Sequence, residues 1–204
     1  MPTCRVAVAI GGLAATSVLC AATIEVVDVS RKQGRYELLA DAHLGATPQA
    51  LYHVLTDYDD NHFARIWSAY KESRYLGPAA DGTPMIYTRM EGCVVLHCMS
   101  LRRTERLETE EPYRIRTYTV PEQSDFKFSK SEWVLEPEGA GGTRVTYKLE
   151  MEPDFRLPPL IGPWYLKRTL SKGVAGALMR IEQLARELDG VPVGSAISPG
   201  EAEH

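Results

Sequence analysis

The stretch GTRVTYKLEMEPDFRLPPLIGPWYLKRTLSKGVAGALMRIEQLA, residues 142–185, contains two periodic segments joined by a proline-rich loop. Between residues 144 and 151, apolar and polar residues alternate, which predicts a strand with one buried side and one solvent-facing side. After Pro163, apolar residues recur at helical spacing as far as Leu188, and Asp189-Gly190 ends the run. The stretch therefore predicts a last strand followed by a long amphipathic C-terminal helix.

The chain before this stretch is mainly extended. Two segments flank a turn at Lys32–Gly34, and Thr47-Pro48 starts a helix with a capping residue and a proline in the first turn. A second short helix is predicted over residues 61–68, and about six strands follow it. Because most gaps between those strands are two to six residues long, the pattern predicts hairpins in an antiparallel meander.

These elements predict an α+β fold with a curved antiparallel sheet of six to seven strands, two short helices and one long C-terminal helix. A helix is about 10 Å wide, whereas six or seven strands spaced about 4.8 Å apart make a wider sheet. One helix therefore cannot cover the concave face, and we expect a hollow that holds a ligand. The candidate lining residues are mostly Met and aromatic side chains: Tyr58, Phe63, Trp67, Met85, Tyr87, Tyr118, Phe126, Phe128, Trp133, Met151, Trp164, Leu178 and Ile181.

Residues 57–62, Asp-Tyr-Asp-Asp-Asn-His, have two interpretations. In the structural one they form a helix-to-helix corner, since Asp is a good cap and turn former. In the catalytic one an Asp pairs with His62 as a general base, but the segment offers no nucleophile and no second His. The sequence also has no HExxH, GxSxG, GxGxxG or Walker motif. We therefore favour the corner and predict no catalytic residue, no metal site and no cofactor.

The charge pattern disfavours nucleic acid as the main partner. The net charge is −4, whereas phosphate binding needs a strongly basic surface. The basic residues on adjacent predicted strands are interpreted as a solvated sheet face, with binding of an anionic head group as the alternative: Arg102, Arg103, Arg106, Arg114 and Arg116.

The two ends of the chain differ from its middle. An uncharged run from Val6 to Ile24 follows Arg5 and resembles a secretory signal, residues 1–22, with cleavage expected after Ala22. This predicts an exported, periplasmic protein with one folded domain over residues 23–189; a retained membrane anchor is the alternative. Residues 190–204 are rich in Gly, Pro, Ser and Glu, and we expect a disordered tail.

Cys93 and Cys98 are the two cysteines that follow the predicted cleavage site. In an oxidising compartment two nearby cysteines can pair. On one straight strand, two residues five positions apart face opposite sides and lie too far apart for a disulfide. Pairing therefore requires a turn or a bulge between them, and the sequence leaves the question open.

Two stretches carry a resemblance to a known superfamily. One is ATPQALYHVLTDYDDNHFARIWSAYKESRYL, residues 46–76, and the other is the stretch quoted first. With the meander between them, residues 24–189 resemble the START and pollen-allergen-like helix-grip superfamily (SRPBCC), in its polyketide cyclase/dehydrase and coenzyme Q-binding branch. The resemblance implies a cavity for an apolar or amphipathic small molecule, because members mostly bind lipids, isoprenoid quinones, sterols or polyketides.

Three functions follow as hypotheses. The leading one is an exported binding protein for a hydrophobic small molecule, such as a lipid or an isoprenoid quinone, with transient membrane contact. The second is an enzyme similar to the polyketide cyclases and aromatases that uses the same cavity. The third is an interaction module that acts through the outer sheet face. A wholly apolar cavity favours the first, a buried cluster of charged residues favours the second, and a cavity too small for a ligand favours the third.

Overall fold

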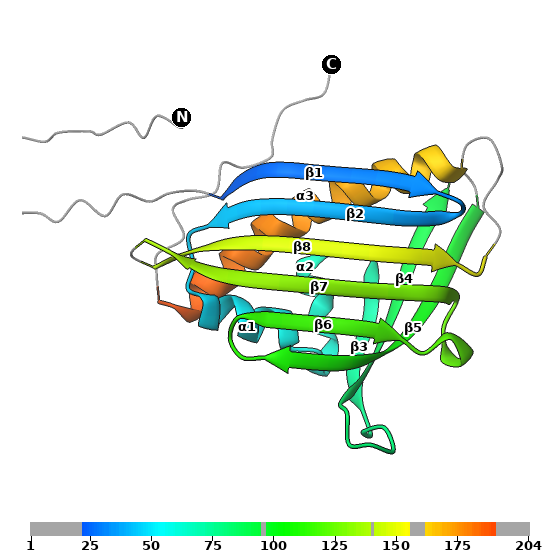
Figure 1. The fold of residues 1–204 in the computed structure, drawn as a ribbon, viewed down its shortest axis with the longest axis horizontal. Helices are drawn as coiled ribbons and strands as arrows, with labels where there is room; N and C mark the ends of the chain where they lie inside the picture. Colours follow the sequence, from blue (N-terminus) through cyan, green and yellow to red (C-terminus); the bar gives the residue numbers. More distant parts are fainter. Residues whose placement is uncertain (1–21, 95–96, 140, 156–161, 191–204) are drawn as a thin grey trace, which may run out of the picture.

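The computed structural model describes residues 22–94, 97–139, 141–155 and 162–190. Within these residues, eight strands form one antiparallel sheet in the order β1-β2-β8-β7-β6-β5-β4-β3 (Figure 1). The strands are β1 (Thr23–Lys32), β2 (Arg35–Leu44), β3 (Tyr70–Leu76), β4 (Met85–Val94), β5 (His97–Glu110), β6 (Arg114–Thr119), β7 (Phe126–Glu138) and β8 (Gly142–Pro153). The helices are α1 (Pro48–Thr56), α2 (Phe63–Ile66) and α3 (Gly162–Leu188), with short 3-10 turns η1 (Asp59–Asn61) and η2 (Pro121–Gln123).

The predicted α+β architecture is confirmed, although the sheet has eight strands instead of six or seven. The N-terminal hairpin turns at Gln33 and Gly34, whose φ angles are 51° and 89°. Both of its strands belong to the same sheet as the meander, because β2 pairs with β8 along nine residue pairs that end at Leu44 and Thr143. The second and the last strands of the sequence are therefore neighbours in space.

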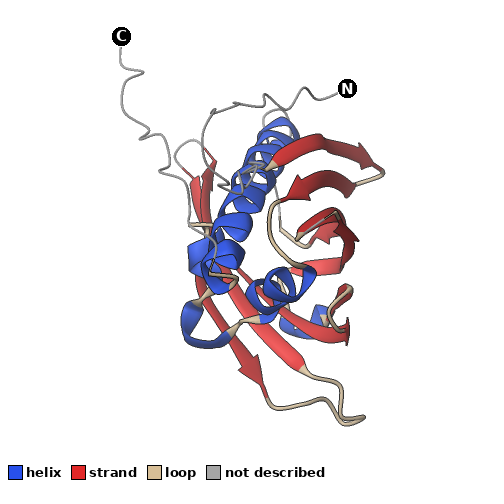
Figure 2. Ribbon diagram, turned by 90° about the vertical axis from the view of Figure 1, so that its left-hand side faces the viewer, coloured by secondary structure: helices blue, strands red, loops and turns tan. Residues whose placement is uncertain are grey.

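Helix α3 lies on the concave side of the sheet, which curves around it (Figure 2). Its inward side chains are buried, and Leu178 and Ile181 are both only 1% exposed. Leu188, at the end of the predicted apolar stripe, is 62% exposed and does not take part in the core. The packing of this stripe on the sheet explains why a helix with only moderate apolar content is held in place. Among the described helices, none is both long and apolar enough to cross a membrane.

The segment after α1 forms a helix-to-helix corner, as the structural interpretation predicts. The hydroxyl of Thr47 accepts the N–H of Ala50 at 3.2 Å and so caps α1. The predicted second helix is shorter than residues 61–68, because Asp60 and Asn61 adopt left-handed φ angles of 46° and 62°. The turn η1 and the four-residue helix α2 replace it, and the side chain of Asn61 accepts the N–H of Ser73 at 3.0 Å.

The N-terminal end of the fold is attached to α3. The carboxylate of Glu182 accepts the N–H of Ala22 at 3.0 Å and the N–H of Gly45 at 2.7 Å. Ala22 is the last residue of the predicted signal, so residues 1–21 of that prediction and residues 191–204 of the predicted tail lie outside the described residues.

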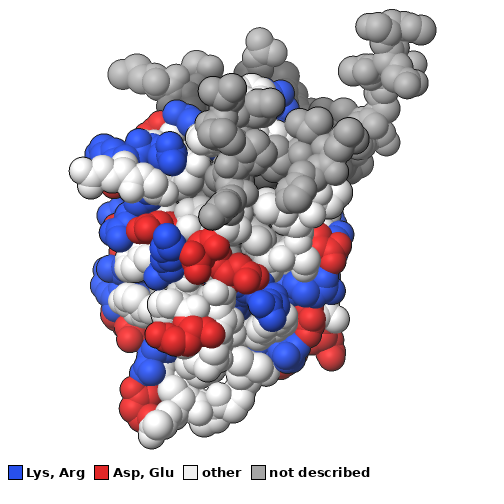
Figure 3. Space-filling model, turned by 90° about the vertical axis from the view of Figure 1, so that its right-hand side faces the viewer, with Lys and Arg blue, Asp and Glu red and all other residues white. Residues whose placement is uncertain are grey.

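The convex face of the sheet is polar and carries charges of both signs. Figure 3 views the molecule from the right-hand side of Figure 1, and on that side Lys and Arg are interspersed with Asp and Glu. On β2 the imidazole of His43 lies between two carboxylates, with 3.1 Å from its Nε2 to Glu25 and a short hydrogen bond from its Nδ1 to Glu138. The hydrogen bond to Glu138 raises the pKa of His43 above its usual value; partial burial opposes the rise and Glu25 adds to it.

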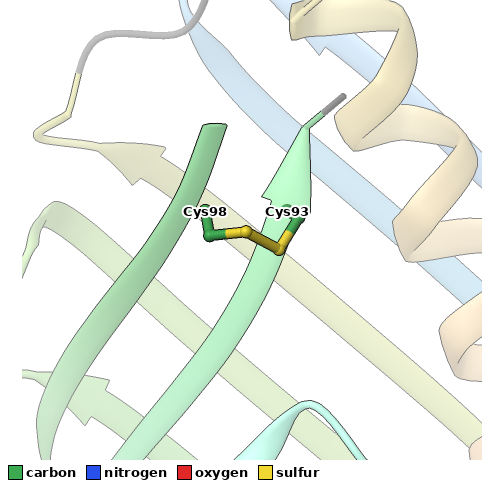
Figure 4. Close-up of a disulfide and its surroundings, with 2 residues drawn as sticks. All are labelled: Cys93 and Cys98. Carbon is green, nitrogen blue, oxygen red and sulfur yellow. A yellow bond between two sulfur atoms is a disulfide. The ribbon is translucent and has the colours of Figure 1, made fainter. Parts of the chain in front are cut away.

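Cys93 and Cys98 form a disulfide (Figure 4). They are direct partners in the pairing of β4 with β5, and their Cα atoms are 3.9 Å apart. A disulfide between these residues required a turn or a bulge between them. This requirement is met, because the chain reverses between β4 and β5 and brings the cysteines opposite one another. The disulfide joins the ends of β4 and β5 nearest their connection.

Candidate functional site

A cavity of about 190 Å³ lies between the concave face of the sheet and the inner side of α3. Apolar side chains make up nearly all of its wall, and β4, β5, β7, β8 and α3 all contribute to it. Trp133 of β7 stacks on Tyr147 of β8 with ring centroids 4.0 Å apart, and Trp67 meets Tyr70 edge to face at 5.9 Å. The predicted hollow therefore exists, and aromatic rings shape it.

The volume limits what the cavity holds in this conformation. An engineered apolar cavity of about 150 Å³ binds benzene, whereas usual ligand pockets begin at about 300 Å³. The cavity therefore accommodates a single ring or a short chain, and a complete polyprenyl chain is too large for it. The predicted hydrophobic ligand fits here only as its ring or as part of its chain.

Six of the predicted lining residues lie in the cavity wall. Three come from the sheet, two from the segment around α2 and one from α3: Phe126, Trp133, Met151, Phe63, Trp67 and Ile181. All six are buried or half-buried. The sheet positions lie on the concave side, where apolar side chains at alternate positions meet α3.

The other seven predicted residues do not line this cavity. Three are buried elsewhere in the fold: Tyr58, Met85 and Leu178. Three more have a ring that is covered by an Arg or Lys side chain, whose Cζ or Nζ atom is 4.4 to 5.6 Å from the ring centroid: Tyr87, Tyr118 and Phe128. Trp164 is 61% exposed on the surface of α3. The candidates were selected by residue type alone. The face of the strand on which a side chain lies decides whether it can line the cavity.

A charged pair lies at the wall of this apolar cavity. The Nε of Arg103 is 2.9 Å from Oε2 of Glu105, and the two side chains are only 12% and 2% exposed. The hydroxyl of Thr117 donates to Oε1 of Glu105 at 2.8 Å. Nη2 of Arg103 donates to the hydroxyl of Tyr70 at 3.4 Å. Arg103 itself lines the cavity, so its guanidinium is the one cation that the described wall presents to a ligand.

The environment keeps the groups of this cluster in defined protonation states. Burial, the largest single influence, would lower the pKa of Arg103, but the charge of Glu105 together with the nearby phenols of Tyr70, Tyr147 and Tyr58 outweighs it, and the net pKa lies above the usual range. Burial raises the pKa of Tyr147 and of Tyr58 well above the ordinary value of a phenol. Both phenols therefore keep their proton at neutral pH and do not act as bases.

The interpretation of the basic residues as a solvated sheet face fails for Arg103. Arg102 has a side chain that is 66% exposed and fits that interpretation, whereas the side chain of Arg103 is only 12% exposed. The signal that identifies it is a period of two on β5, where Leu101, Arg103, Glu105 and Leu107 occupy alternate positions and so share a face. An Arg and a Glu between two Leu on one face of a strand predict a buried ion pair.

The Asp-His segment lies outside the cavity. His62 Nδ1 hydrogen-bonds to the carboxylate of Asp57, and Arg65 Nη2 reaches the same carboxylate at 3.1 Å. The carboxylate therefore has its partners within the corner, and none of the three residues reaches the cavity wall. Within the described residues no group of His, Cys, Asp and Glu side chains is arranged to hold a metal ion.

Comparisons with known proteins agree with this architecture. The family model described as "Polyketide cyclase / dehydrase and lipid transport" matches residues 36–188. A search of curated proteins gives no match. Among solved structures, a START superfamily protein from Mycobacterium smegmatis shares 19% identity over 72% of this chain and 98% of its own, with a TM-score of 0.55.

Two further solved structures differ in what their names state. The Zhui aromatase/cyclase from Streptomyces sp. R1128 is 13% identical over 76% of this chain and 96% of its own, with a TM-score of 0.58. The STAR-related lipid transfer protein from Xanthomonas axonopodis is 19% identical over 78% of this chain and 98% of its own, with a TM-score of 0.57. At these identities the likeness concerns the fold. The family model covers three quarters of the sequence, and the chain therefore belongs to the polyketide cyclase/dehydrase and lipid transport family.

Proposed function

We propose that the protein binds a small hydrophobic molecule in the cavity between the sheet and α3, with a polar oxygen of that molecule held at Arg103. The observation that carries the proposal is the pair of Arg103 and Glu105, of which Arg103 lines a cavity wall that is mostly apolar and has Glu91 as its other charged residue. The family and the names of the structural neighbours, which include a lipid transfer protein and an aromatase/cyclase, support ligand binding of this kind.

The charge of the pair selects the kind of polar group. Glu105 neutralises Arg103, so the cluster as a whole has no net charge and does not attract a free anion into the apolar cavity. Arg103 still has N–H groups that point to no side chain among the described residues. A carbonyl or hydroxyl oxygen suits these donors. The proposed ligand is therefore a neutral ring or short-chain compound with such an oxygen, and the ring of a quinone is one example.

The proposal also includes export of the protein. The uncharged run near the N-terminus supports a secretory signal, and a disulfide between β4 and β5 agrees with an oxidising compartment. The proposed location is the periplasm, with cleavage near Ala22. N-terminal sequencing of protein recovered from the periplasmic fraction tests it, and a product that keeps Met1 on a membrane contradicts it.

The experiment that tests ligand binding compares two variants at neighbouring positions of α3. Ala177 lines the cavity, and Ala175 on the same helix does not. In Ala177→Phe a phenyl ring enters the cavity, and we expect it to abolish displacement of a fluorescent apolar probe by quinones or short-chain lipids. Ala175→Phe should bind as the unaltered protein does. Native mass spectrometry of protein purified from its host then identifies any bound compound. Equal binding by both variants would place the ligand elsewhere.

A second function is favoured by the same cluster. Arg103 and the hydroxyl groups of Tyr70 and Tyr147 present several donors around one region of the cavity, and donors of this kind stabilise an enolate formed during ring closure. Turnover of a linear poly-β-ketone analogue to an aromatic product would establish a cyclase. Binding of the analogue without a new ultraviolet absorption would leave the protein a carrier.

A further inference from the structure

The outer side of α3 has a charge that differs from the rest of the chain. From residue 155 to residue 181 the sequence contains no Asp or Glu, although the net charge of the chain is −4. Exposed cations lie on α3 and on the neighbouring α2, and we name this group the basic face: Arg65, Lys167, Arg168, Lys172 and Arg180. This local excess of positive charge needs an explanation of its own.

Contacts within the protein satisfy only part of this charge. Arg65 reaches Asp57 at 3.1 Å, and Arg180 donates to the side-chain oxygen of Gln183 at 2.7 Å. Among the described residues, Lys167 and Lys172 make no ion pair. Three members of the basic face, one of them Lys172, also border a groove of about 590 Å³ between α2 and α3. Positive charge is therefore concentrated around a concave, accessible surface.

The stability of the helix does not account for this arrangement. The N-terminal end of a helix favours acidic side chains, and its C-terminal end favours basic ones. The first turn of α3 contains no acidic residue, and Lys167 and Arg168 follow in the second turn. The exposed Glu187 lies near the opposite end. The dipole favours Arg186 in the last turn but not Lys167 and Arg168, so the stability of the helix does not explain the cations near its N-terminal end.

An exposed tryptophan lies at the same end of α3. Trp164 is 61% exposed, and the guanidinium of Arg168 is 5.7 Å from the centroid of its ring. A Trp side chain is favoured at the boundary between membrane and water, where cations meet anionic lipid head groups. The next two residues, Tyr165 and Leu166, line the cavity. The surface with the Trp and the cations is thus directly beside the proposed ligand site.

We propose that the basic face, together with Trp164, docks the protein on a membrane surface that contains anionic lipids. The positive charge complements the negative lipid surface, and the rest of the chain, which is acidic, favours this one orientation. Docking through this side places the cavity wall at Tyr165 and Leu166 next to the bilayer, the source of hydrophobic compounds. An acidic protein would also match the charge, but the exposed Trp beside the cations favours lipid.

Co-sedimentation with vesicles tests the proposal. The protein should bind vesicles of phosphatidylcholine mixed with phosphatidylglycerol, should not bind pure phosphatidylcholine, and should bind less as salt rises. The triple variant Lys167→Gln, Arg168→Gln, Lys172→Gln should bind about 100-fold more weakly, at about fivefold per cation. A matched control removes three exposed cations on strands, Lys71→Gln, Lys130→Gln, Lys148→Gln, and should keep the affinity.

The aromatic part of the surface has its own control. Trp164→Ala should weaken vesicle binding, whereas Tyr113→Ala, at a side chain that is 52% exposed beyond β5, should not. Urea unfolding and probe displacement in solution should be unchanged in the triple variant, so that loss of docking is separated from loss of fold or of ligand binding. Failure to bind mixed vesicles, or equal losses in the two triple variants, would overturn the proposal.

Discussion

Replacing Arg103 by Leu tests the buried ion pair directly. The substitution leaves the carboxylate of Glu105, 2% exposed, with the hydroxyl of Thr117 as its remaining hydrogen-bond partner among the described residues. Removing one partner of a buried pair costs about 3–5 kcal/mol, because an uncompensated charge stays in an apolar environment. We therefore expect the free energy of unfolding of Arg103→Leu to fall by about that amount.

The double variant Arg103→Leu, Glu105→Leu separates this cost from the value of the pair. Removing both charges together is often neutral and sometimes stabilises a protein by about 1–4 kcal/mol, so the double variant should be more stable than Arg103→Leu. Urea unfolding monitored by circular dichroism measures the free energy of unfolding of both variants. The double variant should also bind an oxygen-bearing ligand about 10- to 100-fold more weakly, which is the usual loss of a hydrogen bond from a charged donor of about 1.5–3 kcal/mol.

The reasoning has a clear refutation. If the single and the double variants lose the same stability, the two side chains are not coupled and the burial of Glu105 carries no penalty. If the double variant is folded and binds the ligand with full affinity, Arg103 does not contact the ligand's oxygen. Conservative replacement by Lys provides a further check, because an ammonium keeps the charge but cannot reproduce the planar set of donors.

Three other expectations concern different parts of the fold. Leu178→Ala should lower the free energy of unfolding by about 2–5 kcal/mol without changing ligand affinity. Ile181 faces the cavity, so Ile181→Ala should cost less stability and should alter ligand affinity. Equal effects of the two variants would indicate a solid core. Because the pKa of His43 is raised in the folded state, it should add stability that is complete below the unfolded pKa of about 6.5 and is lost as pH rises through the folded pKa. Urea unfolding at several pH values should show this loss, and the loss should be absent in His43→Gln. Replacing Cys93 and Cys98 by Ser should lower the free energy of unfolding by about 2 kcal/mol, the chain-entropy value for so short a loop, and no loss would show that the bond does not restrict the unfolded chain.

The fold could be predicted from the sequence because its signals are local and periodic. The alternation in β8 and the helical stripe of α3 identify two neighbouring elements, and the short gaps identify the hairpins. The pairing of β2 with β8 has no such signal, since it joins residues about a hundred positions apart. The extent of the sheet therefore depended on a contact that local patterns do not encode.

The candidate site was predicted less completely than the fold. Trp133 and Phe126 were identified because large apolar residues on strands tend to be buried. Phe128 was misplaced because β7 has an irregularity between Phe126 and Phe128, and a shift of one position moves a side chain to the other face. Arg103 was missed because a charge is expected in solvent unless its neighbours on the same face are examined.

The adjacency of β2 and β8 has a consequence for the order in which the protein is made. Strand β2 leaves the ribosome early, but the neighbour that pairs with it along Tyr36–Leu44 is complete only after residue 151 has been synthesised. Until then, only the N-terminal hairpin contact is available to it. Proteins with many such distant pairings fold slowly. We therefore expect the nascent chain to remain unfolded until most of it has emerged, which is the state that a translocation channel accepts.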